Sequence, residues 1–312
     1  MAGARRGRLV GVAIGLAGLI AAATAVTAPA SGAQAAPPVV TGVVKVGAPI
    51  QVNSKSAKST LAVCPYGTRV VGGGGWAYEV TTTAPERLAL TRLQPIDDVD
   101  GNGGDGFVAA ATEVAPGVTG DWWIDAYALC ADAASLPGWH INAVFSASTS
   151  DTVQTEVAVC DDQVNQRVIG AGASVRPPLG ADNEVMLQVA APVDFGRVAL
   201  ARAHEDANGY VGDHWLGVYA ICMDTPAGYE LKTVRSAATG SESVKTASVR
   251  CGGLKRNLSA GAALPDPSPA QLVLQRVFPT STATNGVDVT GLEAAPTSAS
   301  WNVTAHAICV SR

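Results

Sequence analysis

The chain has 312 residues, of which 47% are hydrophobic and only 15% are charged, and its formal net charge is −5. This balance is typical of a globular protein and excludes an intrinsically disordered one. The lack of a net positive charge argues against nucleic acid as a partner. Abundant alanine and an excess of arginine over lysine suggest a GC-rich bacterial source.

Residues 1–35 have the pattern of a secretory signal peptide. Arginines within residues 5–8 precede an uncharged apolar run at 9–26, and Ala33-Gln34-Ala35 matches a signal-peptidase site. The alternative is an uncleaved membrane anchor, because the run approaches the roughly 18 residues that a span needs. The alanine- and glycine-rich run and the cleavage site favour removal. We therefore expect a secreted, extracellular protein with no membrane attachment after cleavage.

Six cysteines in the remaining chain alternate between two sequence contexts. The first of each pair ends a short β-prone run such as "STLAVC": Cys64, Cys160 and Cys251. The second ends a run such as "DAYALC", "GVYAIC" or "TAHAIC": Cys130, Cys222 and Cys309. A tryptophan lies seven or eight residues before each closing cysteine: Trp123, Trp215 and Trp301. This order of motifs predicts three homologous repeats.

Two further motifs recur between the cysteines of each pair. A segment of small residues begins at Arg69 ("RVVGGG"), at Arg167 ("RVIGAG") and, in eroded form, at Asn257 ("NLSAGA"). A middle strand ending in proline follows as "LTRLQP", "LQVAAP" and "LQRVFP". No helix pattern follows the glycines, and a phosphate-binding loop requires one. We therefore expect small residues here because another backbone or the disulfide comes close.

The repeats predict both the disulfide pairing and the domain organisation. Each repeat should close its own bridge: Cys64–Cys130, Cys160–Cys222 and Cys251–Cys309. A bridge over about 60 residues stabilises the fold by roughly 4 kcal/mol in the chain-entropy model. A metal site is disfavoured because no C-x-x-C spacing occurs. The expected segments are a signal peptide and three β-repeats: 1–35, 36–136, 137–226 and 227–312.

The fold class follows from the closing segments, which alternate with a period of two. In the last one, Trp301, Val303, Ala305, Ala307 and Cys309 fall on one face. Such alternation predicts a half-buried strand with the cysteine facing inward. With about five or six strands in each repeat, we expect an all-β protein. Tandem small β-sandwiches and a single threefold, prism-like assembly remain open.

The motifs resemble those of a known repeat. "CPYGTRVVGGG", followed about 60 residues later by "AYALC", is similar to a triplicated repeat of exported actinobacterial proteins. Cys64-Pro65-Tyr66-Gly67 matches its opening in full, whereas the later repeats open with Cys160-Asp161-Asp162 and Cys251-Gly252-Gly253. That family has no settled activity, so the resemblance implies no catalytic residues. The threefold repeat also faintly resembles the β-prism of vitelline-membrane outer-layer proteins, whose repeats are shorter.

The segment "DDVDGNGGDG" contains a candidate calcium site. Asp98, Asp100 and Asn102 before Gly103 match the first half of a calcium-binding loop. The bidentate glutamate expected at the twelfth position is missing, and Ala109 stands there. A solvated hairpin connection explains the same residues, since Asp, Asn and Gly favour turns. Calcium is thus the one cofactor that the sequence suggests.

A tryptophan and carboxylate cluster is the candidate binding site. Trp122, Trp123 and Trp215, with Asp213 nearby, could form a platform for a glycan. Core tryptophans flanked by acidic turn residues are the competing interpretation. No catalytic motif of the common hydrolase types occurs. We therefore expect a non-enzymatic protein that binds a cell-wall glycan or a surface protein, or that has a structural role. An extracellular glycan hydrolase with a site assembled across repeats is the alternative.

Overall fold

In the part of the chain that the structure describes, β-strands are the main element, as the period-two patterns predict. A computed structural model of the protein describes residues 36–48, 52–80, 87–98, 104–161, 165–176, 184–206, 209–237, 242–265, 272–281 and 285–312. No helix in these ranges is long and apolar enough to cross a membrane. The predicted signal peptide lies outside them. Residues 37–312 form one compact unit.

Each predicted repeat contributes six strands. The first contains β1 (Val44–Gly47), β2 (Ala57–Val63), β3 (Thr68–Glu79), β4 (Leu88–Ile96), β5 (Gly106–Glu113) and β6 (Trp122–Asp132). The second contains β7 (His140–Phe145), β8 (Val153–Val159), β9 (Gln166–Arg176), β10 (Val185–Val193), β11 (Val198–Glu205) and β12 (Trp215–Asp224). The third contains β13 (Glu230–Arg235), β14 (Val244–Arg250), β15 (Lys255–Ala263), β16 (Leu272–Pro279), β17 (Gly286–Glu293) and β18 (Thr304–Ser311). Two short 3-10 turns are η1 (Ala133–Ser135) and η2 (Asp194–Gly196).

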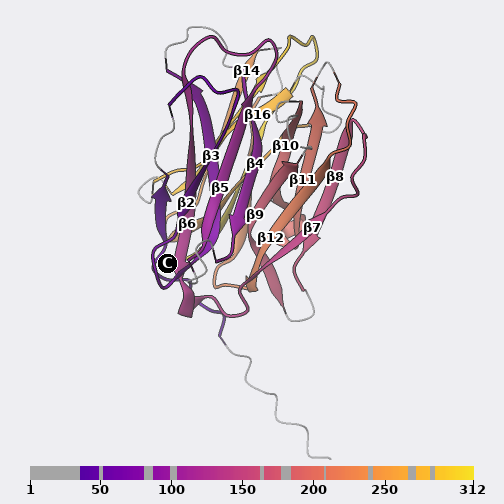
Figure 1. The fold of residues 1–312 in the computed structure, drawn as a ribbon. Helices are drawn as coiled ribbons and strands as arrows, with labels where there is room; N and C mark the ends of the chain where they lie inside the picture. Colours follow the sequence, from indigo (N-terminus) through magenta and orange to yellow (C-terminus); the bar gives the residue numbers. More distant parts are fainter. Residues whose placement is uncertain are drawn as a thin grey trace, which may run out of the picture. The chain divides into compact units, whose positions relative to one another are not determined.

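The strands form three six-stranded sheets, and each sheet is shared between two repeats. Sheet A has the order β1-β6-β3-β16-β17-β14, sheet B the order β2-β5-β4-β9-β12-β7, and sheet C the order β13-β18-β15-β10-β11-β8. Each repeat places three strands in one sheet and three in the next, so the three repeats close into a ring. Figure 1 shows β4 of the first repeat beside β9 of the second. The structure is therefore a single threefold assembly and not a row of separate sandwiches.

The three predicted disulfides are present: Cys64–Cys130, Cys160–Cys222 and Cys251–Cys309. In each repeat the bridge joins the two sheets to which that repeat contributes. All six cysteines are buried. Three such bridges indicate an oxidising compartment.

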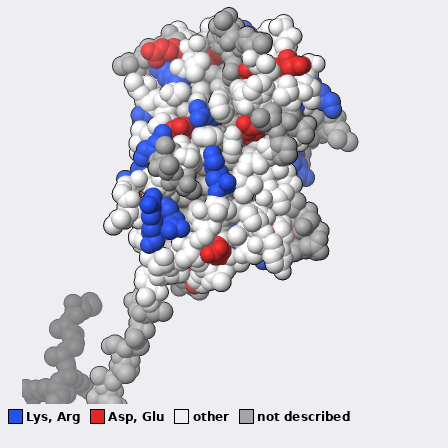
Figure 2. All heavy atoms as spheres, turned by 90° about the vertical axis from the view of Figure 1, so that its left-hand side faces the viewer, with Lys and Arg blue, Asp and Glu red and all other residues white. Residues whose placement is uncertain are grey.

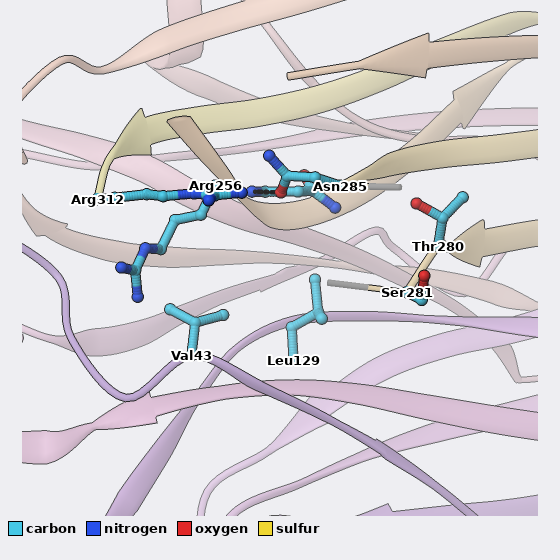
Figure 3. Close-up of a pocket in the computed structure, with 8 residues that line it drawn as sticks. Val43, Leu129, Arg256, Thr280, Ser281, Asn285 and Arg312 are labelled. Atoms are coloured by element: carbon cyan, nitrogen blue, oxygen red, sulfur yellow. Dashed lines mark hydrogen bonds between the residues drawn. The ribbon is translucent and has the colours of Figure 1, made fainter. Parts of the chain in front are cut away.

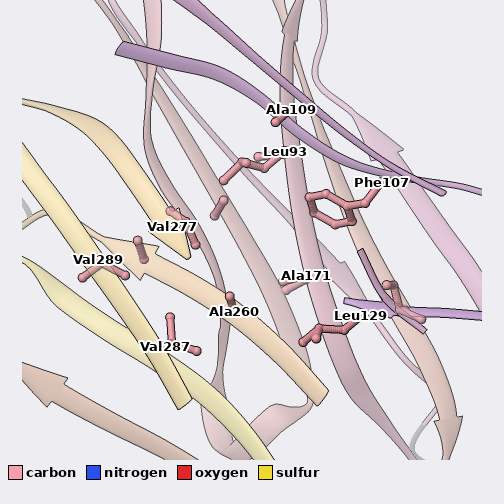
Figure 4. Close-up of a cluster of buried hydrophobic side chains, with 14 of the residues drawn as sticks. Leu93, Phe107, Ala109, Leu129, Ala171, Ala260, Val277, Val287 and Val289 are labelled. Carbon is pink, nitrogen blue, oxygen red and sulfur yellow. The ribbon is translucent and has the colours of Figure 1, made fainter. Parts of the chain in front are cut away.

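One hydrophobic core runs through all three repeats. It contains residues from every repeat, among them Phe107, Ala171 and Val287 (Figure 4). The inward faces of the three closing strands are fully buried, as the alternation predicts. Since no repeat encloses this core alone, the repeats depend on one another for burial.

The glycine motif lies where β3, β9 and β15 approach one another. A Cβ atom on Gly72 would lie 2.4 Å from the carbonyl oxygen of Leu258, and one on Gly170 would lie 2.3 Å from that of Val71. The prediction that a neighbouring backbone comes close is thus confirmed at these two positions. Gly73 differs, because its missing side chain makes room for the ring of Phe107.

The strand register corrects the alignment of the third glycine motif by one residue. The closing cysteines Cys130, Cys222 and Cys309 pair with Val70, Val168 and Asn257, respectively. The third copy therefore begins at Arg256 and reads "RNLSAG", not "NLSAGA". In this register all three copies begin with arginine and keep glycine at the sixth position: Gly74, Gly172 and Gly261.

The last glycine of each motif lies at a seam between repeats. Two residue pairs join β3 to β16, β4 to β9, and β10 to β15. Beside each seam, the glycine packs against the proline that ends the middle-strand motif: Gly74 with Pro279, Gly172 with Pro95, and Gly261 with Pro192. The two recurring motifs are therefore explained by one contact, in which a bare backbone accommodates a proline ring.

We expect Gly74→Ala to lower the free energy of unfolding by about 2 kcal/mol, the typical effect of overpacking a tight site. The added Cβ would lie 2.0 Å from the carbonyl oxygen of Val277, so the seam must open to accommodate it. Urea unfolding with the disulfides intact measures the change. Gly253→Ala is the matched control, because no atom lies within 4 Å of its Cβ position. Equal stability of the two variants would contradict the seam contact.

A cluster of a lysine, a tryptophan and a glutamate lies beside the start of the closing strand in the first and third repeats. In the first repeat, Trp122 Nε1 donates to Glu113 Oε1 at 3.0 Å, and Lys58 Nζ lies 3.9 Å from the centre of the indole ring. The third repeat has the same three residue types: Lys245, Trp301 and Glu293. The second repeat has a different set at these positions: Gln154, His214 and Glu205. The tryptophans that we aligned from the sequence therefore fall at two positions. Trp301 matches Trp122 and His214, while Trp123 matches Trp215.

Candidate functional site

Five aromatic side chains gather on the outer face of sheet A, which we call the aromatic face. They come from three adjacent strands of two repeats: Trp76 and Tyr78 on β3, Trp123 and Tyr127 on β6, and Phe278 on β16. Alternation along each strand directs these side chains outward, whereas their neighbours Gly75, Ala77, Ile124 and Val277 are buried. Each of the five is partly exposed. The face crosses the seam between the first and third repeats.

The rings of the aromatic face contact one another continuously. Trp76 and Tyr78 are stacked with centroids 4.3 Å apart, and Tyr78 meets Trp123 edge to face at 3.9 Å. Phe278 lies edge to face with both Trp76, at 6.1 Å, and Tyr127, at 4.9 Å. Such offset and edge-to-face arrangements are the favourable ones for aromatic pairs. The contacts hold the rings in one fixed layer across three strands.

Two cations lie over this layer. The guanidinium of Arg276 lies 4.4 Å from the ring centre of Trp76 and 4.6 Å from that of Phe278. Lys45 Nζ lies 4.3 Å from the ring centre of Phe278. Burial lowers the pKa of both cations, and Arg276 further lowers that of Lys45. Asp288 pairs with Arg276 at 3.7 Å and with Arg250 at 2.6 Å.

A single carboxylate lies among the rings. Asp125 Oδ2 accepts hydrogen bonds from the hydroxyls of Tyr127 at 3.0 Å and Tyr78 at 3.3 Å. Burial and the Asp125 charge raise the pKa of both tyrosines far above the usual value, so both hydroxyls remain donors. The other oxygen, Asp125 Oδ1, and the indole Nε1 of Trp123 are buried without a hydrogen-bond partner among the described residues. Buried polar atoms normally have one.

The other two sheets show that the fold does not require these aromatic side chains. At the seam position of Trp76, sheet B has Ser174 and sheet C has Ala263. At the position of Phe278, sheet B has Gln94 and sheet C has Ala191. Tyr127 corresponds to Tyr219 and His306. Sheet B is aromatic at two of the five positions, Trp215 and Tyr219, but both other sheets have small or polar side chains where sheet A has Trp76 and Phe278. The continuous layer of five rings on sheet A therefore calls for another explanation.

The structure separates the residues of the predicted glycan platform. Trp122 is fully buried, so its ring cannot contact a glycan. Trp123 belongs to the aromatic face. Trp215 lies on sheet B, where its ring meets Phe145 at 5.2 Å, and Asp213 is exposed in the loop before β12. The four residues therefore do not form one site, and only Trp123 contributes to the aromatic face.

Sequence reasoning missed four residues of the aromatic face. Trp76 and Tyr78 follow the glycines in "GGGGWAYEV", where their alternation with Gly75 and Ala77 places both on one face. That pattern could have identified them. Phe278 could not be found in this way, since it comes from the third repeat and meets the others only because β16 pairs with β3.

The predicted calcium loop is only partly described. Asp100 and Asn102 lie outside the described residues, so the site stays a prediction. Asp98 is described and has a φ of 53°, a left-handed conformation that Asp adopts more readily than most residues. Among the described residues, no group of three or more His, Cys, Asp or Glu side chains could hold a metal ion.

No known family model matches the chain, and no curated protein is significantly similar to it. A function must therefore be inferred from the chemistry of the surface. In the view of Figure 2, Lys and Arg side chains lie in separate groups on a surface that is mostly neither acidic nor basic. Nucleic-acid binding typically uses a continuous basic patch, which this face does not show.

Proposed function

We propose that the protein is secreted and binds a glycan, without catalysis, through the aromatic face of sheet A. The single observation that carries this proposal is the continuous layer of five partly exposed rings on sheet A, in which Trp76 and Phe278 stand at positions where the other sheets have serine, alanine or glutamine. Side chains that the fold does not require, and that form a partly apolar surface, are typical of a binding site.

The chemistry of the face suits a sugar. A pyranose ring has an apolar C–H face and a polar rim, so it can pack on indole and phenol rings while its hydroxyls form hydrogen bonds. Arg276, Lys45 and Asp125 provide charged groups within the same layer. The layer spans strands β6, β3 and β16, and neighbouring strands are about 4.8 Å apart. It can therefore contact more than one sugar unit of a chain.

Two features of the chain support export. Three buried disulfides need an oxidising compartment to form. The signal-peptide pattern of residues 1–35 supplies a route to such a compartment. A bacterial cell-wall polysaccharide is then the ligand that the protein would meet first.

Sedimentation with insoluble glycans tests the proposal. We expect the purified protein to co-sediment with isolated cell walls, or with an insoluble polysaccharide such as chitin or cellulose. Trp76→Ala should weaken this binding about tenfold, as removal of a central aromatic side chain does in other binding sites. Trp215→Ala on sheet B is the matched control and should bind like the wild type.

Three outcomes would contradict the proposal. Equal binding by Trp76→Ala and the wild type would exclude the aromatic face. Loss of binding after protease treatment of the walls, but not after periodate oxidation of their sugars, would indicate a protein ligand. Soluble sugars released from the polysaccharide during the assay would favour the alternative of a glycan hydrolase.

A further inference from the structure

A pocket of about 500 Å³ lies between the third and first repeats. Its walls are Val43, Leu129, Arg256, Asn257, Thr280, Ser281, Asn285 and Arg312. Figure 3 shows the two apolar residues, Val43 and Leu129, on one side and the polar side chains across from them. This volume falls within the usual range for small-molecule sites.

In the other two repeats an aromatic side chain occupies the corresponding place. In the first, Trp139 Nε1 donates to the carbonyl oxygen of Val70 at 2.9 Å, and Arg69 lies 4.7 Å from the centre of its ring. In the second, the hydroxyl of Tyr229 donates to the carbonyl oxygen of Val168 at 2.7 Å. Each aromatic residue comes from the repeat that follows along the chain.

The register shows which residue takes this place in the third repeat. Trp139 and Tyr229 directly precede the residues that pair with the closing cysteines of β12 and β18. In β6 the closing cysteine pairs with Val44, so Val43 is their counterpart. Asn257 supplies the carbonyl equivalent to those of Val70 and Val168. Valine is much smaller than an indole or a phenol, and the pocket is the space that it leaves.

The charges of the third site differ as well. Arg69 pairs with the carboxylates of Asp97 and Asp105, both at 2.9 Å. Asp105 Oδ2 also accepts from the amide of Val70, and Asn285 Oδ1 accepts from the amide of Asn257 in the same way. Asn285 therefore takes the position of Asp105.

The second carboxylate is also replaced. Asp97 lies two residues after the motif proline Pro95, and Ser281 lies two residues after the equivalent Pro279. Arg256, the counterpart of Arg69, consequently has no ion pair among the described residues, and its buried Nε has no hydrogen-bond partner there. Arg312 adds a second guanidinium to the wall. The pocket thus combines the space of a missing ring with two arginines, and the described residues of its lining include no carboxylate side chain.

We propose that this pocket binds a small aromatic carboxylate. The aromatic ring takes the place that Trp139 and Tyr229 fill in the other repeats, over the guanidinium of Arg256, where cation–π attraction favours it. The carboxylate pairs with Arg256 and Arg312, as bidentate arginine pairs do in other proteins. A ring N–H or O–H donates to the Asn257 carbonyl. The site shares no residue with the aromatic face, and the inference does not depend on the glycan proposal.

Isothermal titration of the purified protein with indole-3-acetate tests this inference, because that molecule has the ring and N–H of Trp139 and a carboxylate. We expect saturable binding with a Kd of about 10⁻⁴ M, a typical value for a ligand of this size. Neutral 3-methylindole should bind at least tenfold more weakly, since it cannot pair with the arginines. Acetate alone should not bind measurably.

Two variants and one control locate the site. Val43→Trp restores the aromatic side chain of the other repeats, so it should fill the pocket and weaken binding at least tenfold without lowering the melting temperature. Arg256→Met should weaken the binding of indole-3-acetate to a similar extent. Arg167→Met, at the equivalent position of the second repeat where Tyr229 is in place, should bind like the wild type. If Val43→Trp fails to fold, the comparison of Arg256→Met with Arg167→Met decides alone.

The inference is overturned by any of three results. These are absence of saturable binding up to 10 mM indole-3-acetate, equal affinity for 3-methylindole, and equal affinity of Arg256→Met and Arg167→Met. Loss of glycan binding in Trp76→Ala together with unchanged indole-3-acetate binding would show that the two sites are independent.

Discussion

Trp122→Ala should lower the free energy of unfolding by about 4 kcal/mol, within the usual range for a buried tryptophan. The side chain is fully buried, and its Nε1 donates to the carbonyl oxygen of Lys55 at 2.9 Å and to Glu113 Oε1 at 3.0 Å. Alanine would leave a cavity and would remove a hydrogen-bond donor from a carboxylate. Urea unfolding of the disulfide-bonded protein measures the loss.

The neighbouring lysine adds to this effect. Lys58 is 7% exposed, its Nζ donates to the carbonyl oxygens of Asn53 and Trp122, and it lies over the indole ring. Without the ring, a largely buried charge loses its cation–π partner. Trp301→Ala should behave like Trp122→Ala, because the third repeat has the same cluster.

Trp215→Ala is the control for this prediction. Its ring is partly exposed on sheet B and contacts Phe145 and Arg176, so we expect a loss of only about 1 kcal/mol. A loss from Trp122→Ala no greater than that from Trp215→Ala would show that the cluster has no structural role.

The second large effect concerns acid stability and His306. This histidine is 7% exposed and stands where the other repeats have Tyr127 and Tyr219. Burial lowers its pKa from 6.5 to about 4, against a smaller opposite effect of the Pro192 carbonyl. Between these two values the unfolded chain binds a proton that the folded protein does not. The free energy of unfolding therefore falls as the pH drops below 6.5, by about 3 kcal/mol between pH 7 and pH 4.

His306→Tyr should remove this part of the pH dependence. At pH 5 the histidine accounts for about 2 kcal/mol, so the variant should lose about that much less stability than the wild type between pH 7 and pH 5. Urea unfolding at both values measures the difference. His140→Ala is the control, because His140 is exposed on β7 and should leave the pH dependence unchanged. Parallel stability curves for His306→Tyr and the wild type would contradict the assignment.

His214 acts in the same direction. Burial lowers its pKa as well, opposed by the charge of Glu205. The His306 variant should therefore retain a residual loss of stability in acid. The double variant His306→Tyr/His214→Gln should lose still less stability in acid. The difference between the variants distinguishes the contribution of the two histidines from that of the carboxylates, which titrate at lower pH.

Several features were predictable from the sequence because they are local or repeated. Period-two alternation in the closing segments places their cysteines on a buried face, and the structure confirms this in all three repeats. Six cysteines allow fifteen disulfide pairings, and the same order of motifs in all three repeats predicts one of them. The structure has that pairing. Glycines with no helix after them predict points of close approach between backbones. The contacts of Gly72 and Gly170 with backbone carbonyls agree with that interpretation.

Other features depend on which strands lie side by side, and a single sequence does not contain that information directly. The strand pair β3–β16 brings Phe278 to Trp76 across about 200 residues of chain, so the aromatic face could not be assembled from local patterns. The misalignment at Asn257 has a similar origin, since hydrogen-bond register and not residue similarity fixes which position faces the closing cysteine.

By itself, the sequence determined that this protein is all-β, has three repeats and closes each with a disulfide, because alternation and repetition are properties of the chain alone. Only the tertiary structure decided that the repeats share sheets in a ring, that Trp122 is in the core while Trp123 faces outward, and that Val43 leaves a pocket beside Arg256. The physical reason is that each repeat exposes two half-sheets. The neighbouring repeats bury the inner faces of these half-sheets and form hydrogen bonds with their edge strands. The environment of a side chain therefore depends on a partner strand that is far away in sequence.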